Sequence, residues 1–534
     1  MTESDLPVVE MAPYRWGDPA HPVALPAAAV TALGHLGVKA PAGGPVDPSE
    51  ITLTEPALPP AARSALELVV GADHLDGSAA ARVGHTRGYS TPDLLRLRAG
   101  DATDAPDLVV YPGSHDEVVA VLAACAEHRV AVVPYAGGTS VVGGLAPLRA
   151  GYAGVITLDV RRLDQLVALD EISRTATLQA GLRGPAAEAL LAERGYTLGH
   201  FPQSYEGASI GGYAATRSSG QASAGYGRFD EMVVGLVLAT PRGTVSLGRA
   251  PMSAAGPDLR QLVLGSEGAF GVITSVVVRI RPRPKLRVFE GWRFASFDAG
   301  AAALRKIAQD GPLPTVLRLS DEAETAVNLA DPDVLGGGSG CLAICGFEGT
   351  AAEVPVRGAA VAAVLRSAGG EPLGEGAGET WRLGRYRAPY LRDPLLDAGA
   401  LVETLETAAF WSVVPALKAA VTEALTSSLA GQGTPPLVLC HISHVYETGA
   451  SLYFTVVCAQ TDDPVDQWRA AKSAANAAIA SAGGTITHHH AVGTDHRDAY
   501  TAEVGPLAIE SLRAVKQTLD PTAILNPGIL LPTP

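Results

Sequence analysis

The sequence predicts an α+β protein with a first domain of strands and helices, an α+β second domain and a helical C-terminal segment. Its 534 residues exceed what one hydrophobic core usually supports, so more than one folding unit is expected. Short β-rich runs alternate with amphipathic helices over residues 101–285, and the two prolines of Arg281-Pro-Arg-Pro284 interrupt that pattern. Strands and Ala-rich helices alternate again over residues 286–500. Residues 1–100 are expected to form an N-terminal arm with helical patches, and residues 501–534 a helical segment that returns to the first domain.

The first domain is expected to begin with a strand, a helix and a second strand. Residues 107–112 form a short apolar run that ends in Pro and Gly. Ser114 and Glu117 have the spacing of a capping box, and apolar residues at helical spacing follow to about His128. Residues 130–134 supply the next strand. This order indicates an α/β unit with a right-handed crossover.

The other elements are predicted from the same local signals. β-Branched runs ended by turn residues indicate strands, and apolar spacing of three and four indicates helices. Helices are expected at residues 61–70 and 185–194, and a hairpin turn at residues 241–243. Strands are expected at residues 158–163, 166–170, 175–180, 233–240 and 272–280 in the first domain, and at 316–319, 342–347, 437–441 and 452–457 in the second.

Composition and charge exclude several classes of function. A hydrophobic content of 47% with 18% charged residues is typical of a globular enzyme. The net charge of −15 argues against a nucleic-acid partner, which needs a basic face. No apolar run reaches the ~20 residues that span a bilayer, and the N-terminus lacks the pattern of a signal peptide. We expect a cytoplasmic protein with a small-molecule substrate and no transmembrane segment. Peripheral membrane contact is left open, and a homodimer is expected.

The cysteines indicate neither disulfides nor a metal site. There are five of them, mostly in apolar runs, and Cys341 and Cys345 have no second pair that would complete a tetrahedral site. Buried reduced thiols are therefore expected.

Three glycine-rich loops of the first domain point to a bound anion. They occupy residues 134–140, 207–212 and 265–271, and each joins strong secondary structure. Glycine allows backbone N–H groups to approach an anion without a Cβ in the way. One such loop would indicate only a turn, but three in one domain favour a pyrophosphate site. The nucleotide-binding motifs GxGxxG after a first strand and GxxxxGK[ST] are absent.

The order and spacing of these loops resemble the FAD-contacting segments of the vanillyl-alcohol-oxidase-type (PCMH-type) flavoproteins. Residues 203–209, 216–219, 241–243 and 520–528 belong to the same pattern. The resemblance implies a two-lobed FAD-binding domain at residues 101–285 and a cap or substrate domain at 286–500. Members that link the flavin covalently use a His or Cys near the first loop. Tyr135 and Ala136 stand there in this sequence, so non-covalent FAD is implied.

The resemblance also assigns the cofactor-binding positions. They are Pro134, Tyr135, Ala136, Gly137, Gly138, Thr139, Ser140, Gln203, Ser204, Gly207, Ala208, Ser209, Gly212, Thr216, Arg217, Ser218, Ser219, Gly265, Glu267, Gly268, Gly271, Val272, Ile273 and Asn526.

Within that superfamily the sequence is similar to the alkylglycerone-phosphate synthase family. Segments that stand in the family's order occur in both domains. They are Thr216-Arg-Ser-Ser-Gly220, Met252-Ser-Ala-Ala-Gly-Pro-Asp258, Tyr390-Leu-Arg-Asp393, Glu403-Thr-Leu-Glu-Thr407, Ser451-Leu-Tyr-Phe454 and His488-His-His490.

The histidine triplet can be interpreted in two ways. In a strand or tight turn, neighbouring side chains point to opposite sides, so His488, His489 and His490 are not expected all to face one pocket. One buried and two exposed histidines would then result. A zinc site is not expected, since only Asp495 and His496 offer a loose set of further ligands. The family resemblance instead implies that the triplet lines the active site, where histidine can move protons near neutral pH.

Four further residues are assigned by the resemblance. Tyr453 is implied to exchange a proton with the substrate, although it could be a core tyrosine of a strand. Arg392 is implied to hold a substrate phosphate, although it could pair with Asp393. Thr404 stands where the family has a serine that binds substrate. Arg318 lies in an apolar strand, where a charge needs a partner, and the family's arginine there supports the flavin and the active site.

The resemblance implies an ether-forming transferase. Its substrates would be an acyl-dihydroxyacetone phosphate and a long-chain alcohol, and exchange would proceed through an adduct at flavin N5 without net redox. One alternative is an FAD-dependent oxidoreductase that oxidises a hydroxy acid or another alcohol on the same scaffold, with His490 as its base. Another is a flavin-binding protein without activity, which the clustered ionisable groups disfavour.

Overall fold

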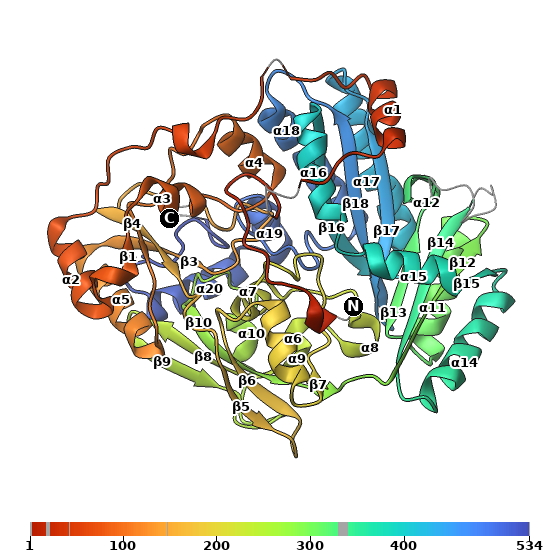
Figure 1. Cartoon of the computed structure of the whole chain (residues 1–534), viewed down its shortest axis with the longest axis horizontal. Coiled ribbons are helices and arrows are strands. Elements are labelled where there is room, and N and C mark those ends of the chain that lie inside the picture. The colour runs from red at the N-terminus through yellow and green to blue at the C-terminus, as the bar shows by residue number, and fades with distance from the viewer. Residues whose placement is uncertain (1–2, 18–21, 42, 147, 329–339, 533–534) are drawn as a thin grey trace.

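The computed structural model describes residues 3–17, 22–41, 43–146, 148–328 and 340–532. The described chain is α+β, and its first domain is built on two sheets (Figure 1). In the described part, the smaller sheet has the strand order β1-β2-β4-β3, in which β2, β4 and β3 are parallel. These strands are β1 (Leu75–Asp76), β2 (Leu108–Val110), β4 (Gly154–Asp159) and β3 (Val130–Tyr135). Helix α5 (His115–His128) connects β2 to β3, and Ser114 caps it as expected.

The larger sheet of this domain is antiparallel, in the order β5-β6-β10-β8-β9. Its strands are β5 (Leu166–Asp170), β6 (Thr175–Gln179), β10 (Val272–Arg279), β8 (Val233–Thr240) and β9 (Gly243–Leu247). One continuous core joins the two sheets, and it includes Leu122 of α5, Ile156 of β4 and Val276 of β10. Most of the predicted elements therefore exist, and the hairpin turn at 241–243 is confirmed. The strand expected at 158–163 is wrong, because the strand ends at Asp159 and Leu163 closes a turn back to Val160.

Short helices and a small ribbon connect the sheets of the first domain. They are α6 (Gly184–Ala192), α7 (Ile210–Thr216), α8 (Ser223–Tyr226), α9 (Phe229–Met232) and α10 (Arg260–Val263), with β7 (Tyr196–Thr197) paired to β11 (Arg281–Pro282).

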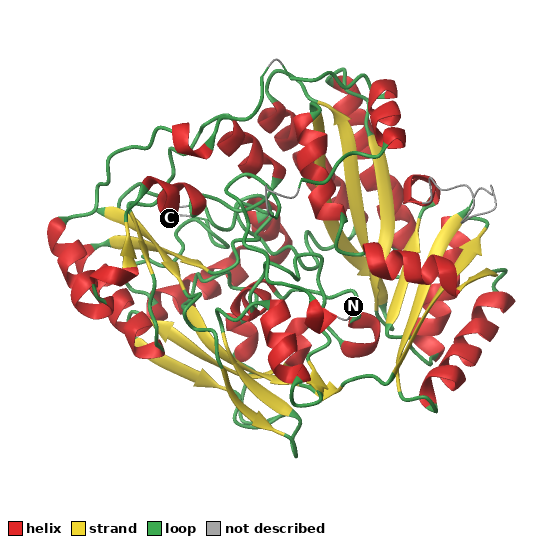
Figure 2. Ribbon diagram, viewed as in Figure 1, coloured by secondary structure: helices red, strands yellow, loops and turns green. Residues whose placement is uncertain are grey.

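The second domain is centred on an antiparallel sheet of seven strands among the described residues, in the order β15-β12-β14-β13-β17-β18-β16. Figure 2 shows this sheet flanked by helices. The strands are β12 (Leu286–Phe294), β13 (Val316–Ser320), β14 (Cys341–Gly349), β15 (Glu371–Gly374), β16 (Ala400–Phe410), β17 (Leu437–Val445) and β18 (Gly449–Ala459). The helices are α11 (Phe297–Asp310), α12 (Glu322–Asn328), α14 (Glu353–Ser367), α15 (Glu375–Gly384), α16 (Ala388–Asp397), α17 (Val414–Gly431) and α18 (Pro464–Ala482).

Alternate residues of this sheet serve two different cores. On one face, Trp292 and Phe347 pack with the helices α11, α14, α17 and α18. On the other face, Phe289 and Ile344 pack with Phe201 of the first domain. The first domain therefore packs against this second face of the sheet. His444 of β17 and Tyr453 of β18 contact Ser219 and Gln203 of the first domain.

Residues 3–100 pack on both domains rather than on one. Their helices are α1 (Ala27–His35), α2 (Pro60–Val70), α3 (Ala79–Gly84) and α4 (Thr91–Arg98), with 3-10 turns at Glu3–Asp5, Pro48–Glu50 and Ala72–His74. Helix α2 joins the core of the first domain, and Leu94 of α4 packs on Leu396 of the second. Strand β1 extends the smaller sheet.

After α19 (Arg497–Val504) and α20 (Pro506–Leu519), the chain returns to the first domain. The N–H of Val132 donates to the carbonyl of Ile524, and the N–H of Asn526 donates back to the carbonyl of Val132. All five cysteines are buried and free, as predicted. Among the described residues, no helix is both long and apolar enough to cross a membrane.

Candidate active site

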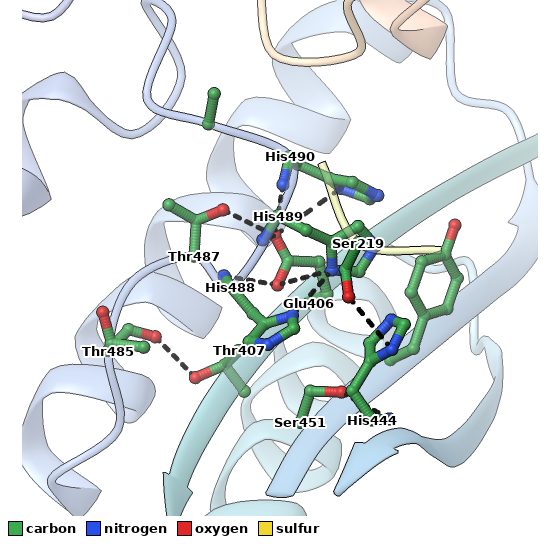
Figure 3. A network of polar contacts seen from close by, with 12 residues as sticks. Ser219, Glu406, Thr407, His444, Ser451, Thr485, Thr487, His488, His489 and His490 are labelled. Atoms are coloured by element: carbon green, nitrogen blue, oxygen red, sulfur yellow. Dashed lines mark hydrogen bonds and ion pairs between the residues drawn. The ribbon is translucent and has the colours of Figure 1, made fainter. Parts of the chain in front are cut away.

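The centre of the candidate site is the carboxylate of Glu406, in the middle of β16 (Figure 3). It accepts hydrogen bonds from the backbone N–H groups of His488 at 2.6 Å, His489 at 3.1 Å and His490 at 2.9 Å. The hydroxyl of Thr487 donates a fourth at 2.5 Å. Burial alone would raise the pKa of Glu406, but the three histidines hold that pKa well below its ordinary value. A buried carboxylate thus fixes the loop that carries the triplet.

The three histidines all belong to one cluster of rings, so the expectation that they could not share a pocket is wrong. Residues 487–490 form a loop wrapped around Glu406, and the alternation of a strand does not apply to it. The ring centroids of His489 and His490 lie 4.7 Å apart, and those of His488 and His489 lie 5.2 Å apart. Burial lowers the pKa of each histidine from its ordinary value. Neutral imidazoles, which can accept a proton, are the result.

Tyr453 of β18 faces this cluster. Its ring lies 6.1 Å from the ring of His489 and 5.5 Å from that of His490, measured between centroids. The Tyr453 hydroxyl is 3.5 Å from Oε1 of Gln203, which belongs to the second FAD-related segment of the first domain. Burial raises the pKa of Tyr453 to about 12. The phenol is therefore protonated near neutral pH and sits where the two domains meet.

Arg392 lies in α16 and is buried beside Glu403 rather than bonded to Asp393. Its Nη1 is 3.9 Å from Oε1 of Glu403, and its Nε has no hydrogen-bond partner among the described residues. Asp393 instead accepts a hydrogen bond from the backbone N–H of Trp16. Thr404, the next residue of β16, is half-buried. The guanidinium thus keeps unused donor capacity in a buried position.

Arg318 of β13 does not touch the histidine cluster. It forms an ion pair with Glu324 at 2.8 Å, and Glu324 in turn lies 3.0 Å from Nδ1 of His441. The ring of His441 stacks on Tyr453 at 4.9 Å. Arg318 therefore supports Tyr453 through two intermediate side chains, and the partner that its buried charge requires is Glu324.

The three glycine-rich loops converge in the first domain. A Cβ on Gly137 would meet the backbone of Gly207 and Ala208, so the first and second loops are in contact. A Cβ on Gly268 would meet Pro134, so the third loop also packs on the first. The amide of Asn526 donates to the carbonyl of Glu267 at 2.6 Å, which attaches the C-terminal segment to the third loop.

Other FAD-related residues hold these loops in place. Ser209 caps α7 through the N–H of Gly212, and the Thr216 hydroxyl donates back to the carbonyl of Gly212. Arg217 donates through Nε to the carbonyl of Leu264, next to Gly265. Further positions on the converging segments are Tyr135, Ala136, Gly138, Thr139, Ser140, Ser204, Ser218, Ser219, Gly271, Val272 and Ile273.

Comparison with known proteins agrees with this arrangement. Residues 106–247 match the FAD binding domain family, and residues 283–530 match the family described as FAD linked oxidases, C-terminal domain. The alkyldihydroxyacetonephosphate synthase of Dictyostelium discoideum is 33% identical over 86% of this chain and 79% of its own length. The chain belongs to the alkyldihydroxyacetonephosphate synthase family.

Solved structures and other relatives support the same fold. A structure of an alkyldihydroxyacetonephosphate synthase superposes with a TM-score of 0.82 at 27% identity, covering 97% of this chain and 98% of its own. An uncharacterized FAD-linked oxidoreductase of Escherichia coli strain K12 is 30% identical over 80% of this chain and 89% of its own length. The predicted α+β fold with a PCMH-type domain is confirmed, and the chain is an FAD-dependent enzyme.

The residues of the first loop fit FAD, the cofactor named by the matched domain family. Among the described residues, no protein atom accepts a hydrogen bond from the backbone N–H groups of residues 137–140. Gly138 has a φ of +68°, a conformation that turns successive N–H groups to one side. This row of free donors suits the pyrophosphate of FAD. Arg183, whose guanidinium donates to the carbonyl of Gly207, adds a positive charge beside it.

Sequence reasoning assigned no role to four residues of this site. Glu403 and Glu406 belong to the family-like segment at residues 403–407. Nothing in the sequence, however, indicates that a carboxylate inside a strand would bind the backbone N–H groups of a distant loop. His444 of β17 contacts the triplet, with ring centroids 5.0 Å from His488. Lys472 of α18 is buried, and burial lowers the pKa of its ammonium. Only the tertiary structure brings that charge close to Glu403 and Glu406.

Proposed function

We propose that the chain replaces the acyl group of an acyl-dihydroxyacetone phosphate by a long-chain alcohol, forming an ether without net redox. The observation that carries this proposal is the pairing of two features at one domain boundary. One is the cluster of Tyr453 with neutral histidines, which suits proton exchange. The other is the buried guanidinium of Arg392 with unused donors, which suits a phosphate. A phosphorylated substrate with an exchangeable C1 proton needs both.

Each group has a separate part in the exchange. In the overall reaction the bond from C1 to the acyl oxygen breaks and the carboxylate leaves. The bond from C1 to the alcohol oxygen forms, and the alcohol releases its proton. Bound FAD supplies the electrophilic and nucleophilic centre that this exchange requires. Tyr453, with its raised pKa, suits a proton donor or acceptor at C1 of the substrate. His489 and His490, whose rings lie beside that of Tyr453, are placed to receive the proton that the alcohol releases.

The phosphate would bind between the two domains. Arg392 offers a planar guanidinium, and Thr404 offers a hydroxyl on the adjacent strand. Lys472 provides a second buried cation near Glu403 and increases the positive charge of this region. We further propose that FAD is bound non-covalently, because Tyr135 and Ala136 occupy the loop position of a covalent linkage. Denaturation by acid should then release all the flavin, and flavin retained by the polypeptide would contradict this.

The proposal is tested with Arg392→Lys, which keeps the charge but loses the two-pronged geometry. A hydrogen bond to a charged group is worth about 1.5–3 kcal/mol, so kcat/KM for the acyl substrate should fall roughly ten- to a hundredfold at normal FAD content. Arg98→Lys is the matched control, because Arg98 is also buried but pairs with Asp397 and Asp393 rather than with Glu403. Equal kinetics of Arg392→Lys and the wild type would exclude Arg392 from substrate binding.

The oxidoreductase function is the second candidate, since an FAD-linked oxidoreductase is among the relatives. The two functions differ in their effect on the flavin. Anaerobic mixing with acyl-dihydroxyacetone phosphate and an alcohol should give ether product without lasting loss of flavin absorbance. Lasting reduction by a hydroxy acid, without ether product, would favour the oxidoreductase. The expected homodimer can be tested by light scattering of the holoenzyme.

A further inference from the structure

Three imidazoles of the candidate site are close enough to share one metal ion. His444, His488 and His489 each offer a ring nitrogen, and these three nitrogens lie within 4.8 Å of one another. His444 comes from β17 and the other two from the loop held by Glu406 (Figure 3). This set could not be predicted from the sequence, because spacing along the chain does not place His444 beside the triplet.

The hydrogen bonds of the rings decide which nitrogens are available. Nδ1 of His444 lies 2.6 Å from the Ser223 hydroxyl and 3.1 Å from that of Ser219, which leaves Nε2 for other contacts. Nε2 of His488 lies 2.6 Å from the Tyr446 hydroxyl, which leaves Nδ1. Metal-binding histidines in proteins are commonly held in this way, with the second ring nitrogen bonded to a fixed partner.

The distance between the two neighbouring rings also suits a cation. Nδ1 of His488 lies 3.0 Å from Nδ1 of His489, so the two nitrogens point at each other. Zinc binds imidazole nitrogen at about 2.0–2.1 Å, which in a tetrahedral site separates two ligand atoms by about 3.3 Å. A shift of a few tenths of an ångström would therefore admit the ion. The buried charge of Glu406, with an oxygen 3.6 Å from Nδ1 of His489, would offset the charge of the cation.

We propose that His444, His488 and His489 form a binding site for one divalent, nitrogen-preferring transition cation such as Zn²⁺ or Co²⁺. Three protein ligands leave a fourth position for water. A bound ion would occupy lone pairs that the histidine cluster needs for proton transfer. Occupancy should therefore inhibit turnover reversibly, and a chelator should restore it.

The test is titration of the FAD-loaded protein with Zn²⁺ by calorimetry, and with Co²⁺ by absorption at wavelengths beyond the flavin bands. One saturable ion per chain is expected. His444→Gln should weaken binding by about a hundredfold or more, and Tyr446→Phe, which removes only the partner of His488, by about tenfold. The matched control is His441→Gln, which lies on the same strand and bonds to Glu324 instead of joining the three nitrogens.

Each outcome decides the proposal. Loss of binding in His444→Gln with retention in His441→Gln supports the site, provided FAD content and circular dichroism are unchanged. If His444→Gln fails to fold, Tyr446→Phe replaces it in the same comparison. Absence of a saturable ion in the wild type, or equal binding by the wild type, His444→Gln and Tyr446→Phe, would overturn it. Because binding is read without turnover, such a failure leaves the transferase proposal untouched.

Discussion

The carboxylate of Glu406 holds His489 by both its backbone and its ring. It accepts the backbone N–H at 3.1 Å, and another of its oxygens lies 3.6 Å from Nδ1 of the imidazole. Glu406 is only 1% exposed, so the charge and the donors around it are shielded from water. A buried network of hydrogen bonds around a charge stabilises the fold when all its members are present. Removing one member destabilises the fold, because it leaves buried polar groups unpaired.

Glu406→Gln should therefore disrupt the histidine loop. An amide has one acceptor oxygen and would direct its NH₂ at donors, which leaves buried N–H groups unsatisfied at about 1–3 kcal/mol each. We expect the free energy of unfolding to fall by about 2–5 kcal/mol and turnover to fall at least about tenfold, with FAD still bound. Urea titration of the holoenzyme and steady-state kinetics measure the two effects.

Glu188→Gln is the matched control for that substitution. Glu188 is also a buried carboxylate that accepts two backbone N–H groups and one hydroxyl, from Leu198, Gly199 and Thr197. It lies outside the histidine cluster, so its variant should keep normal turnover. Equal turnover in both variants would contradict the assigned role of Glu406.

Glu188 should also make stability depend on pH. Burial raises its pKa from 4.5 to about 7, against the lowering effect of its hydrogen bonds. Between these two values the folded protein keeps a proton that the unfolded chain has lost. The free energy of unfolding should therefore fall as pH rises from about 5 to 7, by at most about 3 kcal/mol from this group, and flatten above. Chemical denaturation at several pH values measures the slope, which Glu188→Gln should reduce. An unchanged slope would show that Glu188 does not titrate there.

Gly138→Ala should lower the FAD content of the purified protein. Gly138 has a φ of +68°, and a Cβ there would overlap the hydroxyl of Tyr135, so the first loop must shift. Gly151→Ala is the matched control, because Gly151 has a φ of +86° but no heavy atom within 4 Å of an added Cβ. Flavin released by acid, divided by protein concentration, gives the occupancy. Equal occupancy in the two variants would mean that the conformation of the first loop does not control cofactor binding.

Arg318→Met should destabilise the second domain without preventing FAD binding. The substitution removes the arginine partner of the buried Glu324 and leaves it with His441 alone, which costs at most about 3–5 kcal/mol. Arg318→Lys should recover part of that loss because it restores the charge. Denaturant unfolding with parallel measurement of flavin content separates the two effects. If Arg318→Met loses flavin at unchanged stability, Arg318 acts on the cofactor site instead.

The sequence by itself determined the elements that depend on neighbouring residues. Helix α5 begins after Ser114 because its capping box is local, and β8 ends in the turn at 241–243 for the same reason. The glycine-rich loops could also be recognised, because the positive φ angles of Gly138, Gly265 and Gly268 favour glycine wherever the loop is placed. These signals, with the family resemblance, predicted the fold and FAD.

Only the tertiary structure decided how the catalytic candidates meet. Strand β16 was not predicted, because both of its faces are largely buried and Glu403 and Glu406 interrupt its apolar pattern. The sequence could not show that Glu406 would bind the N–H groups of a loop far along the chain. That long-range bonding turns three adjacent histidines toward Tyr453 and His444. The periodicity of a sequence predicts helices and strands, which have regular backbones. The loop at residues 487–490 has no such periodicity, and its shape depends on the buried carboxylate that accepts its N–H groups.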